Sequence, residues 1–248
     1  MFRSLKRVAA TGAVIAVVGG GGKTSLAFAL AEEVARAGGA GIVTTTTKMT
    51  RPHWAKVDLE CKTANETIRS DLSAPRDGAV TLVHAGLDTQ GRYLGLSGDA
   101  ITALASFGMA LLTVEADGSA GRPFKAPAEH EPVIPACASD VVVSVGLKVL
   151  GQPLNSANVH RPERVAAVGM VSEGDPVTSS LITRVLLSPE AGHKGVPVKA
   201  RRHALLNAPS SDEHLRIGQH IAQKLVYGGF DSAVVATAHE HLVHAIVR

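Results

Sequence analysis

Short apolar runs alternate along this chain with segments in which apolar residues recur at helical spacing. Apolar or strand-like runs at residues 13–18, 40–43, 79–83, 109–114, 140–145, 202–207 and 232–236 predict buried strands. Helical spacing follows the first run and predicts further helices over residues 65–72, 99–107, 162–168, 178–187 and 212–226. Strands and helices that alternate in this way favour an α/β protein with a mainly parallel sheet flanked by helices.

The first apolar run ends in Val-Val-Gly-Gly-Gly-Gly-Lys-Thr-Ser, which predicts a phosphate-binding loop. Glycine lets successive backbone N–H groups converge on an anion, and the helix that follows adds its positive N-terminal end. Lys23 is expected to hold the β- and γ-phosphates of a nucleotide, and Thr24 to hold Mg²⁺. The predicted contacts of this loop with ATP or GTP are Gly19, Gly20, Gly21, Gly22, Lys23, Thr24 and Ser25.

The loop departs from both patterns that it matches in part. The pattern GxxxxGK(S/T) requires Gly where Val17 stands, and a shorter variant, KGGxGK(S/T), has Lys where Val18 stands, so no second loop lysine is assigned a role. The alternative is a glycine-rich strand-to-helix turn, as in a dinucleotide-binding protein. Because Lys-Thr follows the glycines directly, we favour a single P-loop NTPase-like α/β domain over residues 1–248, with Pro-rich loop insertions around 118–135 and 146–163.

Two further strand ends carry polar residues toward the same edge of the predicted sheet. Thr44, Thr45 and Thr46 follow the second apolar run and are expected to contact the nucleotide, although a Thr run also suits a plain strand; Lys48, just beyond, is expected to act in catalysis. The buried run at 109–114 ends in Glu-Ala-Asp-Gly, which is similar to a Walker B element. Asp117 is the first choice and Glu115 the second for a carboxylate that holds Mg²⁺ together with Thr24.

Two polar loops supply the remaining candidates. Residues 121–132, called here the Pro-rich segment, are too interrupted by Pro for a helix or strand, and Glu129 and His130 suit binding and proton transfer. Arg161 lies just before a helix predicted to begin at Pro162 and is expected to complete a charge clamp. The simpler alternatives are a linker and a surface salt bridge. The predicted catalytic set is therefore Lys23, Lys48, Asp117, Glu129, His130 and Arg161.

Composition limits the choice of ligand. The 248 residues carry 25 Lys and Arg against 22 Asp and Glu, and the excess of +3 is scattered, which favours small anions over nucleic acid. Aromatic residues make up only 3%, too few for a base-stacking platform. We expect no membrane span and no signal peptide, because the first apolar run leads directly into the glycines. Cys61 and Cys137 form no CxxC pair, and together these features favour a cytoplasmic protein with reduced thiols.

Five motifs in order make the chain similar to a known family. They are Gly-Gly-Gly-Gly-Lys-Thr-Ser, Thr-Thr-Thr-Thr-Lys-Met, Val-Glu-Ala-Asp-Gly-Ser-Ala-Gly, Lys-Ala-Pro-Ala-Glu-His-Glu-Pro and Val-His-Arg-Pro-Glu. Over about residues 12–210 the chain resembles the YqeC family of selenium cofactor biosynthesis proteins, also described as accessory proteins of selenium-dependent hydroxylases. The resemblance implies maturation of selenium-dependent molybdenum hydroxylases, with a selenium donor or molybdenum cofactor and a client hydroxylase as partners.

The same resemblance points to residues in the polar loops and to one departure. By motif it implies Lys125, Glu131, His160 and Glu163 beside the residues already named. Ala120 stands where the family pattern leads us to expect a longer side chain. In a separate comparison with guanine-specific proteins, Ala208 stands where their NKxD motif has Lys after Asn207, so guanine recognition is unsupported and the base stays open.

Three functions remain open at this point. The first is a Mg²⁺-dependent ATPase or GTPase that acts in selenium cofactor maturation, by electrostatic positioning of the phosphates. The second is a non-catalytic module that binds a phosphate or the molybdenum cofactor and docks the client hydroxylase. The third is a small-molecule kinase or ATP-dependent ligase, because related loops serve those reactions as well.

Overall fold

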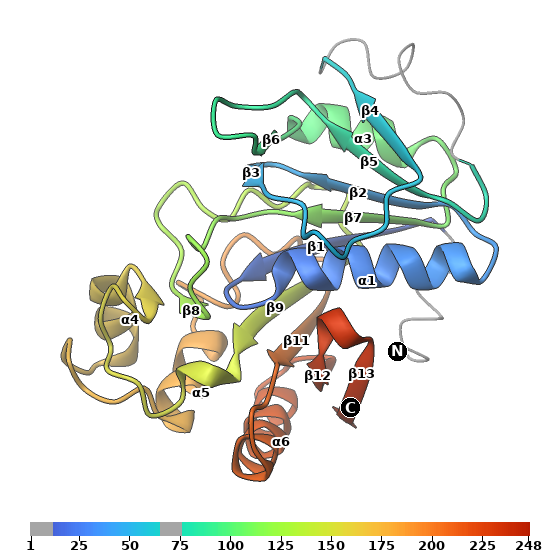
Figure 1. Cartoon of the computed structure of the whole chain (residues 1–248). Helices are drawn as coiled ribbons and strands as arrows, with labels where there is room; N and C mark the ends of the chain where they lie inside the picture. The colour runs from blue at the N-terminus through green and yellow to red at the C-terminus, as the bar shows by residue number, and fades with distance from the viewer. Residues whose placement is uncertain (1–11, 65–75) are drawn as a thin grey trace.

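A mainly parallel sheet forms the centre of the protein. The computed structural model describes residues 12–64 and 76–248, and within these ranges nine strands share one sheet (Figure 1). In chain order they are β1 (Ala13–Gly19), β2 (Gly41–Thr45), β4 (Leu59–Lys62), β5 (Val80–His84), β7 (Leu111–Glu115), β9 (Asp140–Gly146), β11 (Arg201–Asn207), β12 (Ser232–Thr237) and β13 (Leu242–Val247). Their spatial order is β13-β12-β11-β9-β1-β7-β2-β5-β4. β13 alone runs antiparallel to its neighbour, so the prediction of a mainly parallel sheet is confirmed.

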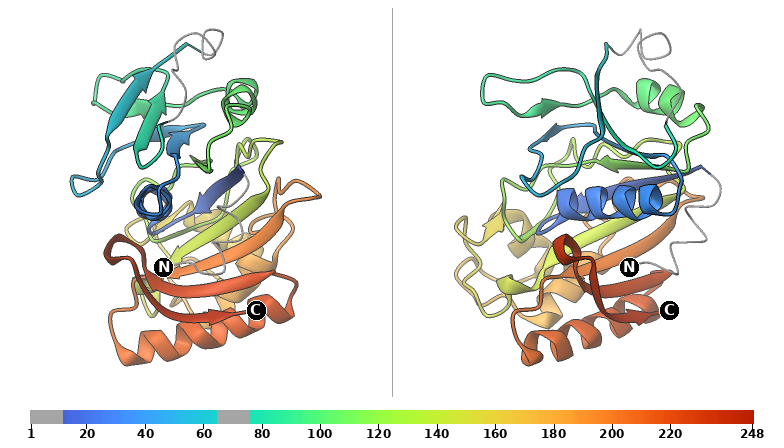
Figure 2. Two further views of the ribbon diagram at one scale, coloured as in Figure 1. Left: turned by 90° about the vertical axis from the view of Figure 1, so that its right-hand side faces the viewer. Right: turned by 45° about the vertical axis from the view of Figure 1, so that its right-hand side comes forward.

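The described part of the chain contains five helices. They are α1 (Lys23–Arg36), α3 (Gly98–Ala105), α4 (Pro162–Gly169), α5 (Ser179–Leu187) and α6 (Asp212–Tyr227), with short 3₁₀ turns η2 (Leu147–Val149) and η3 (Ala238–Glu240). Figure 2 shows α1 and α3 on opposite sides of the sheet. Helices therefore flank the sheet as expected, but α4 packs against α5 and β8 instead of the main sheet. The helix predicted over 65–72 lies outside the described residues.

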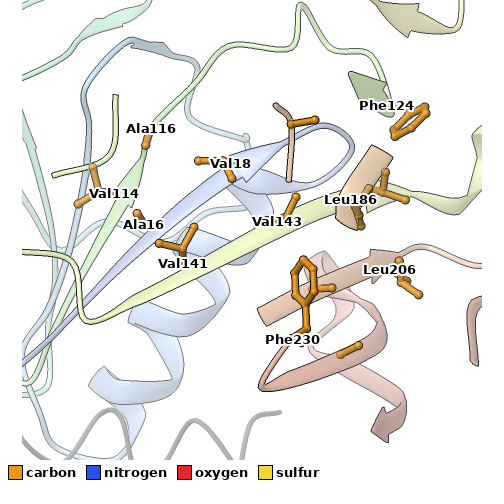
Figure 3. Close-up of a cluster of buried hydrophobic side chains, with 14 of the residues drawn as sticks. Ala16, Val18, Val114, Ala116, Phe124, Val141, Val143, Leu186, Leu206 and Phe230 are labelled. Carbon is orange, nitrogen blue, oxygen red and sulfur yellow. The ribbon is translucent and has the colours of Figure 1, made fainter. Parts of the chain in front are cut away.

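Alternation along β1 explains the two layers. Ile15 and Val17 pack with Leu26 and Leu30 of α1, whereas the intervening Ala16 and Val18 belong to the larger cluster on the other face. That larger cluster joins strand residues to Leu186 of α5 and Phe230 (Figure 3). Because both faces of β1 are covered, the strand is apolar throughout, and its glycine end has a fixed position.

Small two-stranded sheets flank the carboxyl end of the main sheet. β3 (Lys48–Met49) pairs with β6 (Tyr93–Leu94), and β8 (Phe124–Lys125) pairs with β10 (Val159–His160). The sequence prediction that the Pro-rich segment is too interrupted for a strand is wrong at Phe124–Lys125. A strand of two residues needs only one partner of matching register, which local sequence does not reveal.

The connections place β1 at a change of direction in the sheet. The chain leaves β1 through α1 toward β2, but it passes from β7 across β1 to β9 on the opposite side. Ligands of open α/β sheets bind beyond the carboxyl ends of the strands at such a point. In the described ranges, no helix is long and apolar enough to cross a lipid bilayer.

Candidate functional site

The loop between β1 and α1, residues 19–22, is pressed against neighbouring strand ends. Gly22 has φ +118°, and a Cβ at this position would lie 2.1 Å from Nδ2 of Asn207 at the end of β11. Gly21 has φ +68°, and its added Cβ would lie 2.5 Å from the backbone N of Gly146 at the end of β9. Glycine is therefore required here both by the left-handed backbone and by close packing. We call residues 19–22 the glycine loop.

The glycine loop delivers the positive end of α1 to the sheet edge. α1 begins at Lys23, its N-cap Gly22 has no side chain to accept a hydrogen bond, and its first turn contains no acidic residue. The first N–H groups of a helix lack intrahelical acceptors, and the helix dipole favours an anion beside them. The start of α1 is therefore suited to a phosphate, as the sequence predicts.

The ammonium group of Lys23 is surrounded by oxygen atoms. Its Nζ donates to the carbonyl of Gly19 at 2.9 Å and to Oγ of Ser119 at 3.2 Å. It also lies 3.7 Å from Oε1 of Glu115 and 3.5 Å from Oδ1 of Asp117. Only 4% of Lys23 is exposed, so its charge is compensated by these two carboxylates.

Glu115, at the end of β7, is the carboxylate that meets Thr24. Oγ1 of Thr24 donates to Oε2 of Glu115 at 2.6 Å. Burial raises the pKa of Glu115, and the neighbouring Lys23 and the Thr24 hydrogen bond only partly oppose this rise. Of the two acidic residues expected to hold a metal with Thr24, Glu115 is the one that the structure places against it.

Asp117 is fixed instead by the backbone and by a second lysine. The N–H of Gly19 donates to both carboxylate oxygens of Asp117, at 3.1 and 2.9 Å. Nζ of Lys125 lies 3.0 Å from Oδ2 of Asp117. Asp117 therefore holds the start of the glycine loop between two cations, Lys23 and Lys125.

The row of charges continues away from the loop. Nζ of Lys125 lies 2.7 Å from Oε2 of Glu131 and donates at 2.6 Å to the carbonyl of Gly118. Nη1 of Arg161 lies 2.5 Å from the same Glu131 oxygen. An alternating ion row, Lys23–Asp117–Lys125–Glu131–Arg161, therefore joins the glycine loop to the Pro-rich segment and to the N-terminus of α4.

Two groups beside the ion row have shifted pKa values. Burial opposes ionisation of Glu131, but the hydrogen bonds from Arg161 and Lys125 outweigh it and lower its pKa to about 2. Burial lowers the pKa of His160, and the nearby Arg161 and Lys125 act in the same direction. Glu131 is therefore ionised and His160 neutral at pH 7.

A cavity of about 760 Å³ opens beside the start of α1. This volume falls within the range of small-molecule sites. Its lining residues come from the glycine loop, α1, the segment around β3, the residue before β6, the end of β7, the turn after Asp117 and the two polar loops: Gly21, Gly22, Lys23, Thr24, Ser25, Thr47, Lys48, Thr50, Pro52, Arg92, Glu115, Gly118, Ser119, Ala120, Gly121, Glu131 and His160. Lys23, Thr24, Lys48 and Glu115, four of the predicted side chains, therefore face one space.

Other predicted residues lie outside this lining. Glu129 and His130 are exposed, and Glu129 borders a separate cavity of about 410 Å³ beside Lys194. Asp117 and Arg161 belong to the ion row, of which Lys23 and Glu131 line the cavity. The carbonyl of Gly19 accepts from Lys23, and its N–H donates to Asp117. The N–H of Gly20 donates to the carbonyl of Ser144.

The three threonines expected at the nucleotide hold strand ends together. Oγ1 of Thr44 donates to the carbonyl of Val83, Oγ1 of Thr45 to that of Glu115, and Oγ1 of Thr46 to that of Val133. These bonds tie β2 to β5, to β7 and to the loop after the Pro-rich segment. Their hydroxyls position the edge of the sheet rather than line the cavity.

Sequence reasoning did not single out three residues that the site contains. Ser119 accepts from Lys23, the carbonyl of Ser144 anchors Gly20, and Arg92 lines the far wall of the cavity. Ser119 stands two residues after Asp117, a position that could have marked it, whereas the other two carry no local signal. Within residues 12–64 and 76–248, no group of three or more His, Cys, Asp or Glu side chains is arranged to hold a metal ion.

The fold and site define an α/β protein in which a Gly-Gly-Gly-Gly-Lys-Thr loop joins the central parallel strand to a helix at the edge of a polar cavity. The YqeC protein family matches residues 15–163 of the chain. The chain is 32% identical to the uncharacterized protein YqeC of Escherichia coli (strain K12) over 231 aligned residues. The alignment covers 92% of this chain and 88% of the E. coli protein. The chain belongs to the YqeC family.

Proposed function

We propose that this protein is a P-loop NTPase-like enzyme that binds ATP or GTP with Mg²⁺ and hydrolyses it. The observation that carries the proposal is the contact of Thr24 with Glu115 at 2.6 Å, beside the Nζ of Lys23 and at the N-terminus of α1. A cation, a hydroxyl and a carboxylate at one helix start are the groups that a metal-bound triphosphate requires.

The two oxygen ligands present, from Thr24 and Glu115, suit Mg²⁺ better than a metal ion whose ligands all come from the protein. Mg²⁺ keeps several water molecules and takes one or two protein oxygens together with phosphate oxygens. Oγ1 of Thr24 and the carboxylate of Glu115 would be those protein ligands. When bound, the ion would neutralise phosphate charge and lower the pKa of Glu115, which burial raises in the free protein.

Lys23 changes partners when a phosphate enters. In the free protein its ammonium is shared among Gly19, Ser119 and two carboxylates. A phosphate beside the first turn of α1 would offer shorter, charge-assisted hydrogen bonds to the same ammonium. Asp117 would keep its two bonds from the Gly19 N–H and its contact with Lys125, so the loop stays in place while Lys23 serves the phosphates.

The test compares Lys23→Ala with Lys224→Ala, which removes one exposed Lys from α6, away from the cavity. We expect Lys23→Ala to weaken ATP or GTP binding by about tenfold to a hundredfold, the value of a charged hydrogen bond, and to abolish Mg²⁺-dependent phosphate release. Lys224→Ala should behave as the wild type. Equal nucleotide affinity in both variants would refute the proposed site, and binding without phosphate release would mark a binding module.

For the cellular role, we propose maturation of selenium-dependent molybdenum hydroxylases in the cytoplasm, with a selenium donor or the molybdenum cofactor as further ligand. The family resemblance supports this role. The test is to produce a client hydroxylase beside the wild type or Lys23→Ala and to measure its selenium and molybdenum content. We expect selenium to be lost with Lys23→Ala while molybdenum stays. Equal selenium content would refute the role and leave the nucleotide site untouched.

A further inference from the structure

The cavity extends past the glycine loop to a wall that the proposed nucleotide site does not use. Thr47, Lys48 and Thr50 enter it from the segment around β3, and Arg92 enters it just before β6. β3 and β6 pair antiparallel, and Figure 1 shows them next to the carboxyl end of β2. We call these four residues the β3–β6 wall.

Asp88 holds the two cations of the wall in place. Nε and Nη2 of Arg92 lie 2.9 and 2.8 Å from Oδ2 of Asp88, and Nζ of Lys48 lies 3.3 Å from the same oxygen. Oδ1 of Asp88 accepts from the N–H groups of Gln90 and Arg92. Backbone hydrogen bonding, foremost from Arg92, keeps the pKa of Asp88 well below its usual range, so its carboxylate is ionised at pH 7.

One carboxylate against two cations leaves a net positive charge on the wall. The side chain of Lys48 is 51% exposed and that of Arg92 is 40% exposed. Both therefore retain donors for a ligand, and Asp88 fixes their direction. Oriented cations at the side of a cavity are a feature of sites for carboxylates and phosphates.

The wall is attached firmly to the strands that carry the nucleotide residues. The N–H of Leu96 donates to the carbonyl of Thr45, and the N–H of Thr46 to that of Glu115. A Cβ on Gly95 would lie 2.4 Å from the carbonyl carbon of Thr46, so β6 passes directly against the end of β2. These contacts place the wall beside the strand end that carries Glu115.

The order of the strands in the sheet determines where the β3–β6 wall lies relative to Lys23 and Glu115. Lys23 follows β1, Glu115 ends β7, and Lys48 follows β2, and these three strands are neighbours in that order. A ligand on the wall would therefore lie beyond Glu115 from Lys23, at the phosphate end of the nucleotide site. The sequence predicts a catalytic role for Lys48, but its ion pair with Asp88, which also binds Arg92, favours a separate ligand.

We propose that the β3–β6 wall binds the phosphate or carboxylate group of a second small molecule while the glycine loop holds the nucleotide. The inference rests on the proposed function, since it takes the glycine loop as the nucleotide site. It goes beyond that function because it gives the cavity two ligands and makes the second one an anion.

The test fills the nucleotide site first. The full-length protein is saturated with Mg²⁺ and a non-hydrolysable ATP analogue, which also occupies the position of the γ-phosphate. Inorganic phosphate in one arm and succinate in another are then titrated at constant ionic strength, and the rise in melting temperature gives the apparent Kd. We expect saturable binding of at least one anion. Lys48→Ala and Arg92→Ala should each weaken it by about tenfold, the value of a charged hydrogen bond.

Lys56→Ala is the matched control, because Lys56 is exposed and pairs with Asp58 outside the cavity lining. It should leave anion binding unchanged. Binding of neither anion, or equal binding by all variants, would overturn the inference while leaving the nucleotide site intact. Loss of analogue binding in Lys48→Ala would also overturn it, since it would assign the wall to the nucleotide.

If the analogue does not bind the wild type, the proposed function fails. The anion titration is then repeated in Lys23→Ala, which lacks the loop cation. Phosphate or succinate binding that needs Lys48 and Arg92 would still support the wall as an anion subsite. Absence of such binding would overturn the inference independently.

Discussion

At the scale of single residues, Asn207 links three segments that come together at the glycine loop. Its Nδ2 donates to the carbonyl of Gly21 at 2.9 Å, and its Oδ1 accepts from the N–H of Ala238 at 3.0 Å. The side chain is buried, so neither partner has water as a substitute. Asn207 therefore acts as a positioning residue for the loop, whatever base the nucleotide carries.

This arrangement predicts different effects for two substitutions of Asn207. Asn207→Ala removes both hydrogen bonds and should lower the free energy of unfolding by about 1–3 kcal/mol. Asn207→Asp keeps the acceptor for Ala238 but turns a carboxylate oxygen toward the carbonyl of Gly21, so it should destabilise at least as much at pH 7. Urea denaturation checks both. An Asp variant as stable as the wild type would show that the contact with Gly21 is unimportant.

Glu131 allows a prediction that depends on pH. Its pKa of about 2 in the folded protein lies below the ordinary value of 4.5, so the folded state binds fewer protons between these limits. The stabilisation that Glu131 provides is therefore complete above about pH 4.5 and is lost as the pH falls toward 2. Glu131→Gln should be clearly less stable than the wild type at pH 7, and the difference should shrink at pH 3.

Denaturation of both proteins at several pH values measures this difference. Glu163→Gln, at the neighbouring first turn of α4, is a control whose carboxylate has no part in the ion row. A Glu131→Gln deficit that stays constant from pH 7 to pH 3 would indicate a steric cause rather than loss of the ion pairs with Lys125 and Arg161.

At the scale of elements, the junction of β1 and α1 depends on glycine. Gly21→Ala would impose a left-handed backbone on Ala and push Cβ against the backbone of Gly146, 2.5 Å away. Strain of this kind costs about 1–3 kcal/mol even without a clash, so the variant should lose stability and nucleotide binding together. Gly98→Ala, at the start of α3, has open space and no positive φ, and should be neutral or slightly stabilising.

The two alanine variants are compared by thermal denaturation and by titration with the ATP analogue. If Gly21→Ala binds nucleotide as the wild type does, then the close approach of the glycine loop to β9 is not required for the site.

The elements also show how far the sequence determines the fold. All seven predicted strands are present: most are apolar runs buried along their whole length, and β11 and β12 have buried apolar residues after a more polar start. β4 and β13 were not predicted, since both are edge strands without a buried residue. The two-residue strands depend on partners distant in sequence.

In the candidate site, too, some residues could be predicted from the sequence and others could not. The glycine loop, Lys23, Thr24 and Glu115 could be found from sequence because a strand, a turn and a helix leave a local pattern. The choice between Glu115 and Asp117 could not, because it depends on which carboxylate Thr24 reaches across 91 positions of the chain. Asp88 with Arg92, and Glu131 with Arg161, are likewise brought together only by tertiary packing.

At the scale of the whole molecule, nucleotide binding should stabilise the entire fold, because the glycine loop is joined to the ends of β7, β9 and β11. Asp117, Ser144 and Asn207 each bond to a residue of this loop. A ligand that binds only the folded state stabilises it by about 2.7 kcal/mol at a hundred times its Kd. For a chain of this size that corresponds to a rise of about 5–10 °C in melting temperature.

The measurement is a thermal scan with Mg²⁺ and the ATP analogue, combined with amide hydrogen exchange. Protection should rise at residues 19–25 and extend to the Pro-rich segment, because the ion row connects Lys23 to Glu131 and Arg161. In Lys125→Met, which removes the central cation of the row, the analogue should still protect the loop but no longer the Pro-rich segment. Protection confined to the loop in the wild type would show that the ion row does not couple these regions.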